Sequence, residues 1–323
     1  MITQDAQALL LLCSHLGLPD EPPFAPLTLR EWNPLARKLQ ALNLRPGSLL
    51  DRDGSDLQTQ LALPPAQVER LAGLLARHGA LAIVLERLAS LGIYPLTRAD
   101  VDYPQRYRQR LKDSAPAVLF YAGEKALLGQ PGIAIVGSRH LDQAGQECAK
   151  LVGGACGVSG QVLYSGGARG VDTLSMEAAL QARGTAVGVL ADSLEKTVRK
   201  WQDALRRGDL CLMTPYSPDA GFSVGAAMGR NRLIYCLSDY AIVVASDAET
   251  GGTWAGATEA LKNGWAPIFV LEHAQMPEGN KRLLQKGALP FPHPFRESPL
   301  RLSAWLGEHS SGQAGSLRQM TLF

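Results

Sequence analysis

A glycine-rich stretch at residues 165–172 has the residue types that can hold a negatively charged ligand. It follows an apolar run at 161–164, typical of a buried strand, and precedes a helix predicted over 174–180. Glycines let backbone N–H groups approach a ligand, and a helix N-terminus favours an anion. Arg169 could reach a phosphate, whereas Asp172 could either cap the helix or bond a ribose or base. The predicted contact residues here are Ser165, Gly166, Gly167, Arg169, Gly170 and Asp172.

A second turn with similar chemistry lies at Gly137-Ser138-Arg139, after the apolar run 133–136. Gly137 permits a tight turn, and Ser138 can cap the following helix or bond a phosphate oxygen. Arg139 offers a guanidinium fork that matches a phosphate. An ordinary turn with a surface arginine has the same sequence, so both interpretations stay open at this point.

Two arginines and an asparagine, Arg230-Asn231-Arg232, stand just before the apolar run 233–235. Guanidinium donors beside an amide, which both donates and accepts, suit a phosphate together with a base edge. The alternative is the N-terminal segment of a helix with solvated arginines.

A further glycine-rich turn follows the apolar run 241–245 and opens a predicted helix. Gly251 and Gly252 expose N–H groups and Thr253 adds a hydroxyl, so this turn also suits a phosphate. Trp254 is either a core residue or a platform on which a base stacks.

The elements that must position these turns are alternating strands and helices. From residue 132 onward, apolar runs separated by helical stretches occur at 133–136, 162–164, 186–190, 210–213, 241–245 and 268–271. This alternation predicts an α/β, doubly wound, mostly parallel sheet covered on both faces. In such a sheet, ligands bind beyond the carboxyl ends of the strands, so we expect the glycine turns to meet at one edge.

The other parts of the chain differ in pattern. Residues 1–95 carry Leu and Ala at helical spacing, which predicts a small helical domain, SAM-like or helix-hairpin-helix-like. Residues 96–297 would form the sheet domain. Residues 298–323 are expected to be a flexible tail, because 310–316 are rich in Ser and Gly.

The four motifs in this order resemble the DprA/Smf family of bacterial DNA-processing proteins. Asp102-Tyr103-Pro104 looks like the lead-in of that family, and Asn280 with Leu283, Leu284, Gly287 and Ala288 looks like its closing segment. The resemblance covers roughly residues 90–290. It implies an extended Rossmann-like domain, often homodimeric, that binds single-stranded DNA and delivers it to the RecA recombinase in recombination or DNA-mediated transformation. The binding positions that it implies are Gly137, Ser138, Arg139, Ser165, Gly166, Arg169, Arg230, Asn231 and Gly252.

The sequence departs from the family pattern at Ser175-Met176, Thr214-Pro215 and Thr253-Trp254. Residues 251–259 also look like the glycine-rich loop of the LOG nucleotide phosphoribohydrolases. The alternative function is therefore a nucleotide sensor or a LOG-like hydrolase, with phage defence as one setting. In that alternative Glu259, or else Asp172 or Glu249, would assist glycosidic cleavage. We favour a DNA-binding protein that is not an enzyme and has no catalytic residue.

Composition narrows the functional classes. The net charge is only +2, so a nucleic acid would have to be held by a local patch rather than a general basic field. The five cysteines form no C-x-x-C pair and the histidines are dispersed, so we expect reduced thiols, no metal and no cofactor. We expect no signal peptide and no membrane span, and hence a cytoplasmic protein.

The last five residues, Gln319-Met320-Thr321-Leu322-Phe323, resemble the Gln-Leu-x-Leu-Phe peptide by which bacterial replication and repair proteins dock on the sliding clamp. The glutamine amide would make a polar contact, and Leu322 and Phe323 would be buried anchors. A disordered chain end is the alternative.

Overall fold

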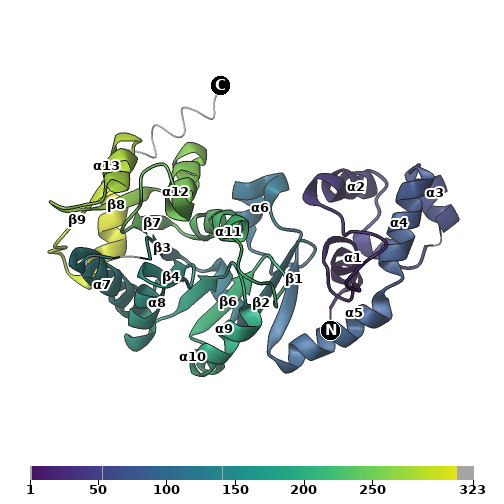
Figure 1. Ribbon diagram of the computed structural model, residues 1–323, viewed down its shortest axis with the longest axis horizontal. Helices are drawn as coiled ribbons and strands as arrows, with labels where there is room; N and C mark the ends of the chain where they lie inside the picture. The colour runs from purple at the N-terminus through teal and green to yellow at the C-terminus, as the bar shows by residue number, and fades with distance from the viewer. Residues whose placement is uncertain (1, 53, 140, 311–323) are drawn as a thin grey trace. The chain divides into compact units, whose positions relative to one another are not determined.

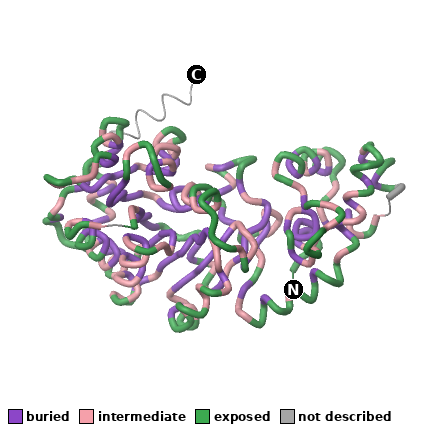
Figure 2. The backbone as a smooth tube through the Cα atoms, viewed as in Figure 1, coloured by how far each residue is buried: buried purple, intermediate pink, exposed green. Residues whose placement is uncertain are grey.

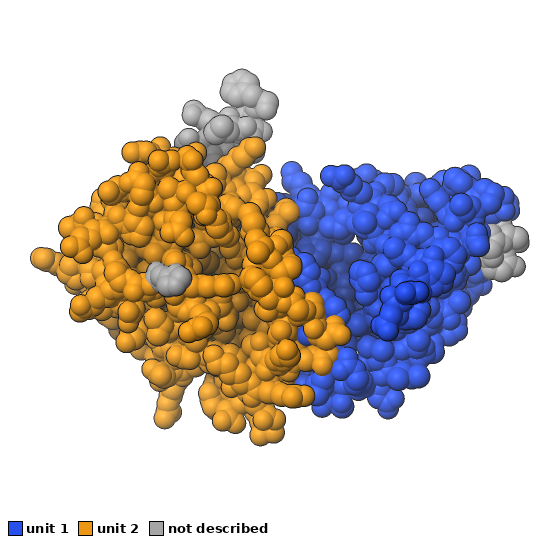
Figure 3. Space-filling model, in the orientation of Figure 1, with its two compact units in different colours: residues 1–121, 215–218 blue, residues 122–214, 219–323 orange. Residues whose placement is uncertain are grey.

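The computed structural model describes residues 2–52, 54–139 and 141–310. These residues belong to two compact units, 1–121 with 215–218 and 122–214 with 219–323, which we call unit 1 and unit 2 (Figure 3). Our predicted boundaries at 95 and 297 stay predictions. The clamp-like peptide, with Gln319, Met320, Leu322 and Phe323, lies outside the described residues. No described helix is long and apolar enough to cross a membrane.

Unit 1 begins with helices, as expected from the leucine spacing (Figure 1). They are α1 (Gln4–Cys13), α2 (Leu29–Ala41), α3 (Gly54–Leu61), α4 (Pro65–Leu75) and α5 (His78–Ser90), with the 3-10 turn η1 (Pro46–Leu49). The sequence did not predict α3. A capping box begins α2, in which the Glu31 carboxylate accepts from the Thr28 N–H at 2.8 Å. The unit continues with β1 (Ile93–Thr97), α6 (Gln105–Leu111), η2 (Lys112–Ser114) and β2 (Val118–Gly123).

A parallel sheet forms the centre of unit 2. Its strands are β3 (Gly132–Val136), β4 (Val162–Ser165), β5 (Ala186–Val189), β6 (Leu210–Thr214), β7 (Tyr240–Val243), β8 (Ile268–Glu272) and β9 (Leu289–Pro292). They lie in the order β6-β5-β4-β3-β7-β8-β9, and each neighbouring pair runs parallel. The chain therefore winds outward from β3 in one direction and then in the other, which confirms the doubly wound α/β prediction. We did not predict β9.

The strands of unit 2 are buried along almost their whole length, and Figure 2 shows them as the buried centre of the unit. Helices cover both faces, so the strands carry continuous apolar runs rather than alternating ones. Tyr164 is a polar exception: its hydroxyl donates to the Gln130 carbonyl at 2.7 Å and to the Leu127 carbonyl at 2.9 Å. This contact holds the turn before β3 against β4.

The α-helices of unit 2 begin near the carboxyl edge of the sheet because each follows a strand, except α10, which follows α9. They are α7 (Gln143–Ser159), α8 (Val171–Gln181), α9 (Leu194–Lys200), α10 (Gln202–Arg207), α11 (Val224–Leu237), α12 (Gly251–Asn263) and α13 (Glu278–Gln285), with η3 (Lys125–Gly129) and η4 (Pro299–Arg301). Residues 302–310 are also helical. The topology reverses at β3, between β4 and β7, which is where such sheets bind ligands.

Candidate functional site

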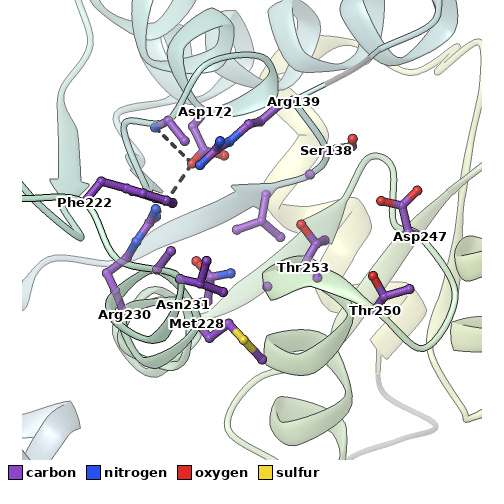
Figure 4. A pocket seen from close by; sticks show the side chains of 17 residues that line it. Ser138, Arg139, Asp172, Phe222, Met228, Arg230, Asn231, Asp247, Thr250 and Thr253 are labelled. Atoms are coloured by element: carbon purple, nitrogen blue, oxygen red, sulfur yellow. Dashed lines mark hydrogen bonds and ion pairs between the residues drawn. The ribbon is translucent and has the colours of Figure 1, made fainter.

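A cavity of about 500 Å³ lies in unit 2, at the point where the strand order reverses (Figure 4). Four segments line it: the end of β3 with 137–139, the loop before α8 with Asp172, residues 222–231, and the loop 247–253 after β7. The cavity brings together most of the predicted contact residues. They are Gly137, Ser138, Arg139, Asp172, Arg230, Asn231, Gly251, Gly252 and Thr253.

A buried ion pair forms one wall of the cavity. Arg230 Nη1 lies 3.7 Å from Asp172 Oδ2, and the two side chains are only 7% and 8% exposed. The Ala168 N–H also donates to Asp172 Oδ2, at 3.3 Å (Figure 4). Burial raises the pKa of the Asp172 carboxyl, whereas Arg230 and the Ala168 N–H act in the opposite direction. The pair therefore ties α11 to the loop before α8, and Asp172 does not serve as the N-cap of α8, which is Gly170.

Gly166 makes room for this pair. A Cβ atom at Gly166 would overlap the Arg230 guanidinium and the Asp172 carboxylate. Gly252 is similar, because a Cβ there would lie 2.6 Å from Asn231 Nδ2. Gly170 has φ +92° and lies against the turn that contains Ser138 and Arg139. A Cβ at Gly170 would lie 2.8 Å from the Ser138 carbonyl oxygen. The sequence suggested that glycines clear space for a ligand; at these three positions the space that a side chain would take is filled by protein.

Arg230 and Asn231 line the cavity, but Arg232 does not. All three lie in the middle of α11 rather than in its first turn, and Arg230 is buried rather than solvated. Successive helical residues point about 100° apart, so three in a row cannot share one face. Arg232 instead lies 3.8 Å from Glu259 and 5.7 Å from the Trp265 ring centroid.

Three other predicted residues lie beside the cavity without lining it. Ser165 is fully buried, and its hydroxyl donates to the Ile135 carbonyl at 2.7 Å. Gly167 has φ +68°, and a Cβ there would lie 2.8 Å from the Leu190 side chain. Arg169 is exposed on the same loop but does not line the cavity. A phosphate contact by Arg169 stays a prediction.

One side of the cavity is apolar and was not predicted from the sequence; it is formed by Phe222, Val224 and Met228. These side chains are 54%, 67% and 44% exposed, which is unusual for large apolar residues. The Arg139 guanidinium carbon lies 5.3 Å from the Phe222 ring centroid. Trp254, our predicted stacking platform or core residue, is 9% exposed and does not line the cavity. Large apolar residues within the otherwise small-residue segment 220–229 are the signal that could have identified this side.

Two further polar residues at the cavity, Asp247 and Thr250, were also missed. Of the acids considered for the hydrolase alternative, Asp172 lines the cavity as half of the buried pair. Glu249 lies 2.6 Å from Arg282, and Glu259 pairs with Arg232; neither lines the cavity. Among the described residues no cluster of three His, Cys, Asp or Glu side chains could hold a metal ion. Burial raises the pKa of the Cys148 and Cys156 thiols to about 12, so both stay protonated near neutral pH.

Comparison with known proteins identifies relatives of the sheet-containing part. The family model described as DNA recombination-mediator protein A matches residues 95–294. The chain is 30% identical over 182 residues to DNA processing protein DprA of Streptococcus pneumoniae and 29% identical over 181 residues to that of Bacillus subtilis. Each match covers 54% of this chain and 63% or 60% of the relative, so the chain spans less than two thirds of these relatives.

Solved structures match more of the chain. The crystal structure of DprA from Streptococcus pneumoniae has a TM-score of 0.65 at 23% identity and covers 90% of this chain and 95% of its own. A structure of DNA processing protein A from Helicobacter pylori, described for its single-stranded DNA binding mode, has a TM-score of 0.55 at 25% identity. It covers 67% of this chain and 97% of its own. The first likeness supports the fold.

Proposed function

The chain belongs to the DNA recombination-mediator protein A family, and from that premise we propose that it binds single-stranded DNA at the cavity of unit 2 without catalysing a reaction. The contact between Arg139 and Phe222 carries this proposal. An exposed aromatic ring beside an exposed guanidinium can stack a base and bind the adjoining phosphate. A base in a duplex is already stacked and paired, so Phe222 would favour a single strand.

The polar lining supports the same assignment. Ser138, Thr250 and Thr253 place hydroxyls on the cavity, and Asn231 adds an amide (Figure 4). These groups can bond phosphate oxygens or a base edge without requiring one sequence. We assign Arg230 a supporting role rather than a direct phosphate contact, because Asp172 already offsets its charge. Arg139 is then the main cationic contact of the cavity.

The wider activity follows from the family. We propose that the protein mediates recombination by delivering the bound strand to RecA, and that it acts as a homodimer. Docking on the sliding clamp through Gln319, Met320, Leu322 and Phe323 stays a separate prediction from the sequence.

A salt-titrated binding assay tests the DNA-binding proposal. Single strand, duplex and a nucleoside monophosphate are compared on wild type and Arg139→Ala. We expect single strands to bind best, and we expect the variant to lose about 0.7 from the slope of log affinity against log salt, as for one lost phosphate contact. Arg296→Ala, which removes an exposed arginine away from the cavity, is the matched control. Single-strand affinity unchanged in Arg139→Ala would refute the assignment.

One observation favours the nucleotide-sensor alternative. A cavity of about 500 Å³ is within the usual range for small-molecule sites, and the Asp247 carboxylate could accept from ribose hydroxyls. Tight binding of the mononucleotide together with weak binding of oligonucleotides would select this alternative. Release of free base would select the hydrolase.

A further inference from the structure

A second hollow of unit 2, with a volume of about 410 Å³, lies between the end of α8 and the short helices α9 and α10. We call it the α9–α10 groove. Arg199, Lys200, Trp201 and Arg207 line it, and none of them lines the cavity described above. Trp201 lies at the junction of the two helices, as the C-cap of α9 and the N-cap of α10. The proposed function does not use this groove.

The two helices beside the groove, α9 and α10, carry a local excess of positive charge. Residues 194–207 contain five basic and two acidic residues, whereas the whole chain has a net charge of +2. The Arg207 Nε–H donates to Asp209 Oδ2 at 2.6 Å, so the charge of Arg207 is already paired. Two carboxylates, Glu177 and Asp203, also line the groove. Arg199 and Lys200 are exposed, and in the described part of the chain neither has a carboxylate partner. These two side chains therefore supply the accessible positive charge.

Trp201 adds an aromatic surface next to that charge. The Lys200 ammonium lies 5.1 Å from the Trp201 ring centroid. Cations beside an aromatic ring are the combination with which sequence-independent proteins hold single strands, since phosphates bind the cations and bases stack on the ring. An acidic protein segment would use the charges but would gain nothing specific from a flat aromatic face.

The chain path connects the groove with the cavity. The Ser193 N–H, just before α9, donates to the Ala220 carbonyl at 2.8 Å, and Phe222 follows two residues later. The seven residues of α9 then extend about 10 Å, at about 1.5 Å per residue, to Lys200. A strand that leaves the cavity at Phe222 can thus follow α9 to the groove.

We propose that the α9–α10 groove is a second contact surface for the same nucleic acid strand, in which Arg199 and Lys200 bind phosphates and Trp201 stacks a base. This inference rests on the proposed function, because the cavity holds the first part of the strand. It adds that long oligonucleotides are bound by both surfaces and short ones by the cavity alone.

The test compares oligothymidylates of about six and about twenty nucleotides on charge variants of the groove. The double variant Arg199→Gln/Lys200→Gln should lower the salt slope for the long strand by about 1.4, since each lost phosphate contact removes about 0.7. Its binding of the short strand should match wild type. Arg206→Gln, an exposed arginine of α10 that does not line the groove, is the control and should change neither slope.

The stacking contact has its own variants. Trp201→Leu should weaken binding of the long strand on the order of tenfold, whereas Trp201→Phe should keep most of the affinity. Equal losses in the two variants, or equal losses for short and long strands, would overturn the proposal. An unchanged salt slope for the long strand in Arg199→Gln/Lys200→Gln would also overturn the proposal. The DNA-binding assignment of the cavity would stand in that case. If wild type bound neither oligonucleotide, the proposed function itself would fail.

Discussion

Replacing Gly166 with alanine tests the buried pair directly. The backbone of Gly166 is outside the left-handed region, so alanine is not excluded by conformation. Its Cβ would, however, occupy the position of the Arg230 guanidinium and press on the Asp172 carboxylate. The arginine must therefore move, and the ion pair at 3.7 Å must open.

The magnitude follows from the burial of the pair. With side chains only 7% and 8% exposed, the pair is weakly screened by water. Opening a buried pair of this kind costs about 3 to 5 kcal/mol, because a charge is left buried without its partner. We expect Gly166→Ala to lose about 3 kcal/mol of unfolding free energy, since the flexible arginine can turn toward the cavity and regain some solvation.

Urea unfolding followed by circular dichroism measures this loss, with hydrogen exchange of the β4 amides to locate it. Gly154→Ala is the matched control: Gly154 lies in α7 with no atom within 4 Å of the added methyl group. It should gain about 0.5 to 1 kcal/mol, as alanine does in a helix. In an Arg230→Met background, the cost of Gly166→Ala should largely disappear. A Gly166→Ala protein that unfolds like wild type, or one equally destabilised in both backgrounds, would refute the reasoning.

Three other predictions concern single side chains. Phe222→Ala should weaken single-strand binding by about 1 to 3 kcal/mol, whereas Phe222→Tyr should not. The free energy of unfolding should stay unchanged in both variants, because the Phe222 ring is 54% exposed. Equal binding of the single strand by both variants in a titration would contradict this. Burial raises the folded pKa of Asp172, so the contribution of this carboxyl to stability is greatest below the unfolded pKa of about 4 and is lost as pH rises toward the folded value. The melting temperature of Asp172→Asn, measured against pH, should therefore lack that decline. A profile parallel to that of wild type would argue against this. Asn280→Ala should cost about 2 to 4 kcal/mol in urea unfolding, since Asn280 is fully buried and bonds Ser246, Val244 and Leu271; a loss below about 1 kcal/mol would contradict this.

Local pattern was sufficient for strands β3 to β8 and for the place of the glycine turns at the ends of β3 and β7, which line the cavity. Ile133 to Val136 is a continuous apolar run because helices cover both faces of β3, and the turn with Ser138 and Arg139 has to follow at the carboxyl edge. Short or polar elements were missed. In β9 two of four residues are prolines, and α3 has few apolar residues, so neither shows a clear period.

The tertiary structure decided which side chains share the cavity. The sequence presents Arg230, Asn231 and Arg232 as one cluster, but the 100° helical rotation directs Arg232 to Glu259 and leaves Arg230 against Asp172, 58 positions earlier in the chain. Phe222 likewise stands out in the sequence only as a large apolar residue in a small-residue segment, and only the fold places it beside Arg139. The sequence by itself therefore determined the strand-and-helix alternation, the edge of the sheet at which the cavity lies and the family, because these depend on residues near one another in the chain. Which arginine is buried and which is accessible depends on contacts between distant segments, and only the folded structure specifies those.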